Sequence, residues 1–260
     1  MTAGWAVVDG TEGPPETAVF PVTDPAVSVG WSVFETLRSD RQGQVHRLDE
    51  HLERLRTSCE AACVPTPPLD RVAEECQRAA AGVVGHARIR VTVSGSGRRV
   101  VLAEPLDPAR MHTGVRAVQG AWRSEPFLGG GVKHGSRAPW VVAVRRSGVD
   151  EVLLVDPAGR FTEGTTCAIL AVMDGALWTA PHDGHILESR TCVEICERAE
   201  ALGIPIVWEG PPADGGWQGL YVASTTRDLA PVLELDGEAL GGWEPIGRRL
   251  IAGVRERFEA

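Results

Sequence analysis

Residues 45–55 read VHRLDEHLERL and open the clearest amphipathic helix in the N-terminal half of the chain. Prolines at positions 65, 67 and 68 follow within a few residues and end that helix. The spacing predicts a helix over residues 48–63, because its apolar side chains recur three or four positions apart. These apolar residues are Leu48, Leu52, Leu55, Cys59 and Ala62.

Short strand patterns surround this helix. Residues 5–8 and 17–22 flank a Gly/Pro-rich turn and predict a hairpin with a long loop. A second helix is expected from about residue 70 to 81, followed by strands over 88–93 and 99–103 around a Ser-Gly-Ser-Gly turn. Residues 1–118 are therefore predicted to form a smaller α+β domain.

The second half begins after a lapse in periodicity that contains three consecutive glycines at 129–131. We predict an interdomain linker over residues 119–132 and a larger C-terminal domain over 133–260. Helices are expected near 138–147, 191–202 and 245–258. Strands are expected at 151–155, 168–173, 176–179, 205–208, 219–223 and 231–235. The fold class is α+β or α/β with two domains.

Composition excludes several classes of protein. The chain has 260 residues with 43% hydrophobic and 23% charged residues, which is typical of a folded globular protein. A net charge of -9 without a basic stripe disfavours nucleic acid as a partner. No apolar run approaches the roughly 20 residues that span a membrane. Residues 1–20 resemble neither a secretory signal nor a transit peptide, so the expected location is the cytoplasm.

Six cysteines are too dilute for a disulfide scaffold. The pairs Cys59/Cys63 and Cys192/Cys196, each four residues apart, could hold a metal as thiolates. Packing on apolar helix faces is the favoured interpretation, because free cysteine behaves as a small hydrophobic residue.

The basic residues are strongly biased, since 25 are arginine and only Lys133 is lysine. Arginine performs ordinary surface-charge roles, but its guanidinium stays charged and cannot act as an amine nucleophile. A lysine amine can lose its proton when desolvated and then form a Schiff base. Lys133 is therefore the candidate catalytic residue, and its chance survival on the surface is the alternative.

Three further segments carry groups that could act together with the Lys133 amine. Glu163 lies at the tip of a Thr-Glu-Gly turn, where a carboxylate could pair with a ring nitrogen. The segment around Thr191 opens a helix whose first N–H groups favour an anion, and Ser224–Thr226 is a hydroxyl cluster at a strand end. Thr191 with Glu194 also matches a capping box, which is a purely structural alternative. Together these groups match the needs of pyridoxal phosphate.

The chain resembles the class IV aminotransferases, the fold type IV pyridoxal phosphate enzymes, over nearly its whole length. Residues 24–38, which end in Phe-Glu-Thr-Leu-Arg, and residues 45–55 are similar to two motifs of that family. The resemblance implies that Lys133 carries the cofactor and that Glu163 pairs with its ring nitrogen. It also implies phosphate contacts from Arg47, Arg190, Thr191 and Thr225, and a homodimer whose cleft lies between the domains.

Two positions depart from the family pattern. Ala168 stands where the family has asparagine after the Thr-Glu-Gly segment, and residues 189–192 read Ser-Arg-Thr-Cys where the family has Gly-Ile-Thr-Arg. The geometry of the phosphate loop is therefore open, although a backbone donor remains at Arg190.

Within the family, the short chain and the stretch Lys133-His134-Gly-Ser-Arg137 favour 4-amino-4-deoxychorismate lyase, which releases pyruvate and the folate precursor 4-aminobenzoate. Arg90 and Arg38 are the residues expected to meet the carboxylates of that small amine substrate. The alternative is an aminotransferase for branched-chain or D-amino acids. A third hypothesis is a degenerate member that binds the cofactor without turnover, against which the intact Lys133 and Glu163 count.

Overall fold

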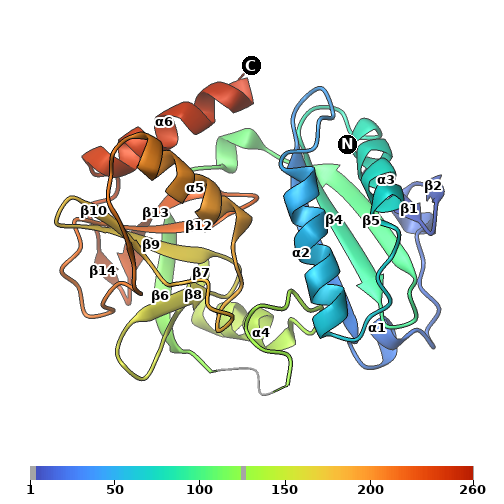
Figure 1. Cartoon of the computed structure of the whole chain (residues 1–260), viewed down its shortest axis with the longest axis horizontal. Coiled ribbons are helices and arrows are strands. Elements are labelled where there is room, and N and C mark those ends of the chain that lie inside the picture. The colour runs from blue at the N-terminus through green and yellow to red at the C-terminus, as the bar shows by residue number, and fades with distance from the viewer. Residues whose placement is uncertain (1–3, 124–126, 260) are drawn as a thin grey trace. The chain divides into compact units, whose positions relative to one another are not determined.

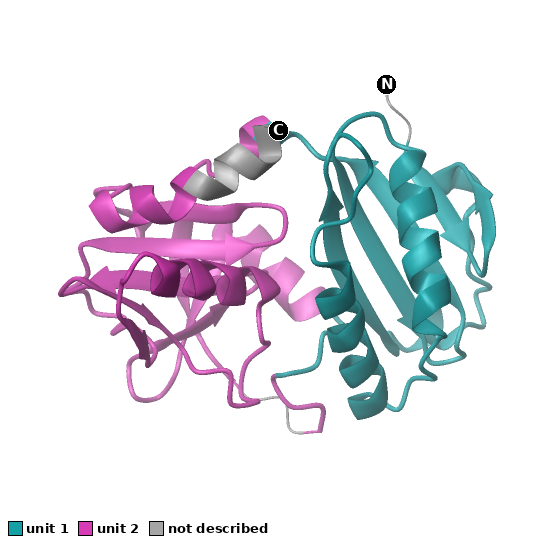
Figure 2. Cartoon of the chain, turned by 45° about the horizontal axis from the view of Figure 1, so that its top comes forward, with its two compact units in different colours: residues 1–108, 131–137 teal, residues 109–130, 138–260 magenta. Residues whose placement is uncertain are grey.

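The computed structural model describes residues 4–123 and 127–259, with side chains described as far as residue 252. The chain divides into two compact units, shown in two colours in Figure 2. Unit 1 comprises residues 1–108 and 131–137, and unit 2 comprises residues 109–130 and 138–260. Each unit is built on its own β-sheet (Figure 1).

Unit 1 contains a five-stranded antiparallel sheet in the order β2-β1-β5-β4-β3. The helices α2 and α3 pack against this sheet and against each other. Its elements are β1 (Trp5–Val8), β2 (Thr11–Gly13), η1 (Pro15–Thr17), α1 (Pro25–Ser28), β3 (Ser32–Ser39), α2 (Leu48–Ala61), α3 (Leu69–Ala81), β4 (Ala87–Ser94) and β5 (Arg99–Pro105).

Alternation along β4, and its register with β3, explains the core of unit 1. Odd-numbered residues such as Leu37, Ile89 and Val91 are fully buried together with Leu55 of α2 and Val72 of α3. Since successive side chains of a strand point to opposite faces, even-numbered residues of β3 and β4 lie on the other face. The helices thus cover one face of the sheet and leave the polar residues of the other face for other contacts.

Unit 2 contains a nine-stranded sheet that closes on itself, because β8 pairs with both β7 and β9. The path runs β11-β10-β9-β12-β13-β6-β7-β8, and β14 pairs with β13. Its elements are η2 (Pro108–Arg110), β6 (Val115–Ala121), α4 (Ala138–Ser147), β7 (Glu151–Val155), β8 (Phe161–Gly164), β9 (Ala168–Met173), β10 (Ala176–Thr179), α5 (Arg190–Ala201), β11 (Ile206–Trp208), β12 (Gly219–Ser224), β13 (Asp228–Leu235), β14 (Glu238–Ala239) and α6 (Pro245–Glu259).

Two apolar clusters stabilise unit 2. One cluster, which includes Leu153, Phe161 and Val222, joins the strands of the closed part of the sheet. The other joins α5 and α6 to the sheet, and Cys192 and Cys196 pack within it. All six cysteines are free thiols, and the described residues contain no cluster of three or more ligating side chains that could hold a metal. Cys59, Cys192 and Cys196 are buried among apolar residues, as the favoured interpretation predicts, whereas Cys63 is exposed just beyond the end of α2 and does not fit it.

Most predicted elements are present, but five strands and the short helix α1 were not expected, and one expected strand is absent. Residues 17–22 form no strand, because β2 at residues 11–13 pairs with β1 in their place. The unexpected strands are β2, β3, β6, β8 and β14. Both β6 and β8 lie inside the sheet of unit 2, where tertiary pairing supports sequences that carry little strand periodicity of their own.

The unit boundaries differ from the predicted domains 1–118, 119–132 and 133–260. Residues 109–123 belong to unit 2, because β6 pairs in parallel with β7 and β13. Residues 131–137 belong to unit 1, because the Phe34 amide donates to the Lys133 carbonyl at 2.9 Å. Residues 124–126 of the predicted linker lie outside the described part of the chain.

Across residues 4–123 and 127–259, no helix combines the length and the apolarity that a membrane span requires.

Candidate functional site

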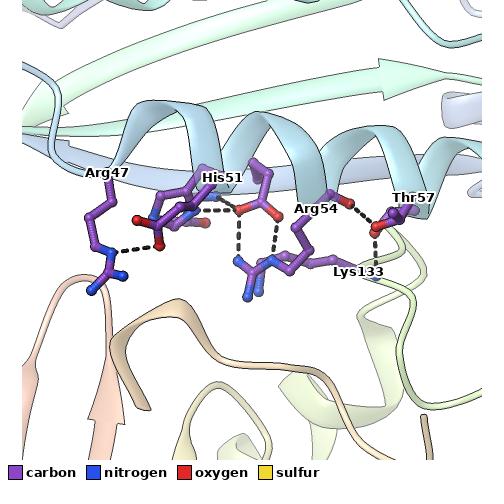
Figure 3. A network of polar contacts seen from close by, with 9 residues as sticks. Arg47, His51, Arg54, Thr57 and Lys133 are labelled. Carbon is purple, nitrogen blue, oxygen red and sulfur yellow. Dashed lines mark hydrogen bonds and ion pairs between the residues drawn. The ribbon is translucent and has the colours of Figure 1, made fainter. Parts of the chain in front are cut away.

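One side of α2 carries a polar stripe of four residues spaced four, three and four apart. They are Arg47, His51, Arg54 and Ser58, and Figure 3 shows Arg47, His51 and Arg54 along the helix with Lys133 on the neighbouring segment. Residues at such spacing share one helix face. The motif VHRLDEHLERL therefore has two faces, one apolar for the core and one polar for the candidate site.

Glu35 of β3 is the centre of this polar network. Its carboxylate is fully buried and accepts two hydrogen bonds from Arg54, from Nε at 2.7 Å and Nη2 at 2.8 Å. The Nδ1 atom of His51 lies 2.9 Å from the same carboxylate. Burial alone would raise the pKa of Glu35, but the Arg54 guanidinium and these hydrogen bonds hold it well below its usual range. Burial lowers the pKa of His51.

Lys133 is held through its backbone by both α2 and β3. Its amide donates to Ser58 Oγ at 3.2 Å, and its carbonyl accepts from the Phe34 amide at 2.9 Å. The next residue, His134, forms a β-bridge with Val33. Three contacts with regular secondary structure therefore fix the segment that carries the single lysine of the chain.

The Phe34 ring lies between two cations. The Lys133 Nζ atom is 4.9 Å from the ring centroid, and the Arg90 Cζ atom is 3.8 Å from it. Both distances are within the range of cation–π interactions. Burial lowers the pKa of Arg90, and the positive charges of Arg88 and Arg137 lower it further. A concentration of positive charge that is partly shielded from water beside an amine is suited to an anion such as a carboxylate.

Arg38 lies on the same sheet face as Arg90. Arg90 is opposite Thr36 in the β3–β4 register, and Arg38 is opposite Arg88, so the alternation of the strands places all four side chains on the Phe34 face. Arg38 is only 2% exposed. The two residues predicted to meet a substrate carboxylate are thus brought to one face of one sheet.

Arg47 lies immediately before α2 in a left-handed backbone conformation, with φ of 49°. Its Nε donates to Glu50 Oε2 at 2.6 Å. A residue with a Cβ in this conformation costs about 1–2 kcal/mol relative to glycine. Such strain concentrates at functional positions, and here it fixes where the Arg47 side chain starts.

In unit 2, strand register brings Glu163 and Thr225 near one another. Glu163 of β8 is opposite Ala168 of β9, and Ala168 is opposite Ala223 of β12, two residues before Thr225. Glu163 Oε2 also accepts a hydrogen bond from the Leu187 amide at 3.4 Å, which connects it to the segment leading into α5. Ala168, where the family pattern has asparagine, is buried in the apolar cluster beneath α5.

The N-terminus of α5 presents the predicted phosphate loop. Its cap is Ser189, whose Oγ accepts from the Cys192 amide at 3.2 Å, so the alternative capping box of Thr191 with Glu194 does not form. Within the described part of the chain, the Arg190 and Thr191 amides and the Thr191 hydroxyl donate to no residue. The Arg190 side chain pairs with Glu188, which leaves its amide as the contribution of that residue to an anion site.

Glu35, His51, Arg54, Ser58 and Phe34 are not among the site residues predicted from the sequence. All five lie in or next to the motifs at residues 24–38 and 45–55, and the 47/51/54/58 spacing is the signal by which the polar helix face can be found. The partner of that face, Glu35, is 16 residues from His51 and could not be identified from helix spacing alone.

Comparison with known proteins defines the family. A sequence model of the class IV aminotransferases ("Amino-transferase class IV") matches residues 32–235, so the chain belongs to that family. The fold is that of the fold type IV aminotransferases. A structure of a hypothetical aminotransferase from Mycobacterium tuberculosis matches with a TM-score of 0.85 and 26% identity, covering 98% of both chains. The same Mycobacterium protein was also solved in a form bound to pyridoxal phosphate.

Two curated relatives cover the chain to different extents. A protein of Methanocaldococcus jannaschii named "Putative branched-chain-amino-acid aminotransferase" is 28% identical over 263 residues, which cover 92% of this chain and 89% of the relative. D-alanine aminotransferase of Staphylococcus aureus is 33% identical over 103 residues, which cover 38% of this chain and 36% of the relative. The similarity to the first therefore extends over both units, and that to the second over a part of the chain.

Proposed function

We propose that this protein is a pyridoxal phosphate-dependent aminotransferase that moves an amino group from a branched-chain amino acid to a 2-oxo acid. Membership of the class IV family and relatives that are aminotransferases support this alternative better than the lyase that the sequence analysis favoured. The branched-chain relatives match along most of the chain, whereas the D-alanine aminotransferases match over about 38% of it. Branched-chain donors are therefore the first choice and D-amino acids the second.

The observation that carries the proposal is the placement of Lys133. It is the single lysine among 26 basic residues, and its backbone is fixed by Ser58 and Phe34. Its amine lies over the Phe34 ring, on which the Arg90 guanidinium also stacks. An amine held beside a carboxylate-binding cation is what a reaction at the α-carbon of an amino acid requires.

Pyridoxal phosphate is the cofactor, and the residues of the chain fit its three functional ends. Its aldehyde would condense with an amine, and its protonated ring would accept the electrons released when a substrate α-carbon loses a proton. Lys133 would supply the amine, and its free Nζ would serve as the base for that proton. Glu163 would hold the proton on the ring nitrogen, and Arg47, Thr191, Thr225 and the Arg190 amide would bind the phosphate.

Arg90 is proposed to bind the substrate carboxylate. Partial burial and the repulsion of Arg88 and Arg137 lower the pKa of Arg90, and a carboxylate partner would relieve that repulsion. Arg38 lies on the same face and is proposed to assist it. The two residues would orient the substrate, because a fixed carboxylate places the substrate α-carbon relative to Lys133.

The test is a half-reaction with purified enzyme loaded with pyridoxal phosphate. L-leucine, L-valine, D-alanine and aminodeoxychorismate are each added without a 2-oxo acid, and the absorbance of the cofactor is followed. We expect L-leucine or L-valine to convert the cofactor to its amine form, and a 2-oxo acid to restore it. In Arg90→Gln the conversion should need at least about tenfold more amino acid, whereas Arg71→Gln on the exposed face of α3 should behave as wild type.

The lyase remains the second candidate, because Arg137 of the Lys-His-x-x-Arg stretch lies close enough to Arg90 for its positive charge to lower the pKa of Arg90. A lyase needs no amino acceptor. Release of pyruvate and 4-aminobenzoate over many turnovers from aminodeoxychorismate, with no conversion by any amino acid, would contradict the aminotransferase proposal. If D-alanine converted the cofactor and neither L-amino acid did, the aminotransferase reaction would stand but the choice of a branched-chain amino donor would be overturned.

A further inference from the structure

Glu151, the first residue of β7, is a fully buried carboxylate with partners in two loops of unit 2. From the loop after β8 it accepts hydrogen bonds from the Thr165 hydroxyl, from the Thr166 amide at 3.1 Å and from the Thr166 hydroxyl at 2.5 Å. From the turn after β12 it accepts a hydrogen bond from Arg227 Nη1 at 3.0 Å. One carboxylate therefore connects two segments that are about 60 residues apart in sequence.

Each of these segments lies within two residues of a residue of the proposed cofactor site. Glu163, proposed for the ring nitrogen, is two residues before Thr165. Thr225, proposed for the phosphate, is two residues before Arg227. Arg227 also donates to Thr166 Oγ1 and to the Asp150 carbonyl, both at 3.3 Å, so the loops are joined directly as well as through Glu151.

The charge of Glu151 is what makes this junction specific. A buried carboxylate is costly unless it is paired and hydrogen-bonded, and here Arg227 neutralises it while the two threonines satisfy its oxygens. The approach of the loop is also close, because a Cβ at Gly164 would lie 3.3 Å from Glu151 Cγ and 2.4 Å from Cys167 Sγ. Neither loop can shift without breaking contacts to this carboxylate.

We propose that Glu151 is a positioning residue that fixes the separation between Glu163 and Thr225, and so between the ring-nitrogen and phosphate ends of the bound cofactor. The inference rests on the proposed function, because it takes the roles of Glu163 and Thr225 from it. Glu151 acts through the two loops and does not touch the cofactor itself.

The test is a double-mutant cycle on cofactor affinity. The dissociation constant of pyridoxal phosphate is measured by tryptophan fluorescence for wild-type apoenzyme, Glu151→Gln, Thr225→Val and the double variant. We expect each single variant to raise the dissociation constant at least about tenfold, and the double variant to raise it little further, because residues that act through one arrangement are not additive. Asp150→Asn is the matched control, since its side chain is half exposed and its carbonyl contact with Arg227 is kept.

A second variant covers the case in which Glu151→Gln does not fold. Thr166 is exposed, so Thr166→Val removes one arm of the junction with little risk to the core, and it should raise the dissociation constant about fivefold. The inference would be overturned if Glu151→Gln and Thr166→Val bound pyridoxal phosphate as tightly as the Asp150→Asn control. It would also be overturned if the two increases in the dissociation constant multiplied in the double variant. If Thr225→Val itself binds the cofactor as wild type, the phosphate assignment under the proposed function fails, and the inference fails with it.

Discussion

The buried network around Glu35 makes a quantitative prediction about Arg54. Replacing Arg54 by methionine keeps most of the side-chain volume but removes both hydrogen bonds to the Glu35 carboxylate, at 2.7 and 2.8 Å. Glu35 is fully buried and Arg54 is 7% exposed, so water cannot replace the lost partner. Removing one member of such a pair typically costs 3–5 kcal/mol, and we expect about that loss in the free energy of unfolding of unit 1.

The expected loss depends on pH in a defined direction. In the wild type the depressed pKa of Glu35 contributes stability above its unfolded pKa of about 4.3, which is lost as the pH falls below it. Without Arg54, burial raises the pKa of Glu35 above its usual value. The penalty in Arg54→Met should therefore be complete at neutral pH and become smaller in acid, as the carboxyl takes up a proton.

Urea unfolding followed by tryptophan fluorescence at pH 7.5 and pH 5 measures both effects. Arg56→Met is the matched control, because Arg56 lies two residues away on α2 and pairs only with the exposed Glu53 and Glu60. Its midpoint should not change. Combining Arg54→Met with Glu35→Gln should recover part of the loss, because no charge is then left unpaired. A loss in Arg54→Met below about 1 kcal/mol, or one that grows in acid, would refute the reasoning.

Two further predictions concern the cofactor residues. Arg47→Ala and Arg47→Gly should both raise the dissociation constant of pyridoxal phosphate at least about tenfold relative to Arg71→Ala. The free energy of unfolding of Arg47→Gly should be about 1 kcal/mol higher than that of Arg47→Ala, because glycine adopts the left-handed backbone conformation at φ of 49° without strain. Equal cofactor affinity in Arg47→Ala and Arg71→Ala would remove Arg47 from the site. Glu163→Gln should bind the cofactor within about threefold of wild type but slow the half-reaction by at least about a hundredfold, measured by stopped-flow absorbance, because a neutral amide holds the ring proton poorly. An unchanged rate would mean that another group holds that proton.

The longer helices α2 to α6 could be predicted from the sequence, most clearly where their apolar spacing is regular, whereas the four-residue α1 was not. The strand β3 could not, since Glu35 and Arg38 are buried charges that break the alternation expected of a strand. The unit boundary was missed for a similar reason. Lys133 joins unit 1 through hydrogen bonds with Phe34 and Ser58, which are distant in sequence. No local sequence pattern predicts such contacts.

The candidate site shows the same division between local and distant information. Lys133 could be singled out because each of the other 25 basic residues is arginine, and the motif around Arg47 could be identified from residues 45–55 alone. The Glu35–His51–Arg54 network and the Glu151 junction needed the fold, because each joins segments from different elements. The lyase hypothesis rested on chain length and one short stretch, whereas the comparisons extend over most of the chain and favour an aminotransferase.

The attachment of the cofactor to Lys133 is the central claim, and borohydride reduction tests it most directly. The enzyme is loaded with pyridoxal phosphate, reduced, digested and analysed by mass spectrometry. Because Lys133 is the single lysine, we expect the reduced cofactor on one peptide, the one that contains residue 133, and none on Lys133→Arg. Cofactor found on the N-terminal amine alone, or full turnover by Lys133→Arg, would contradict the account.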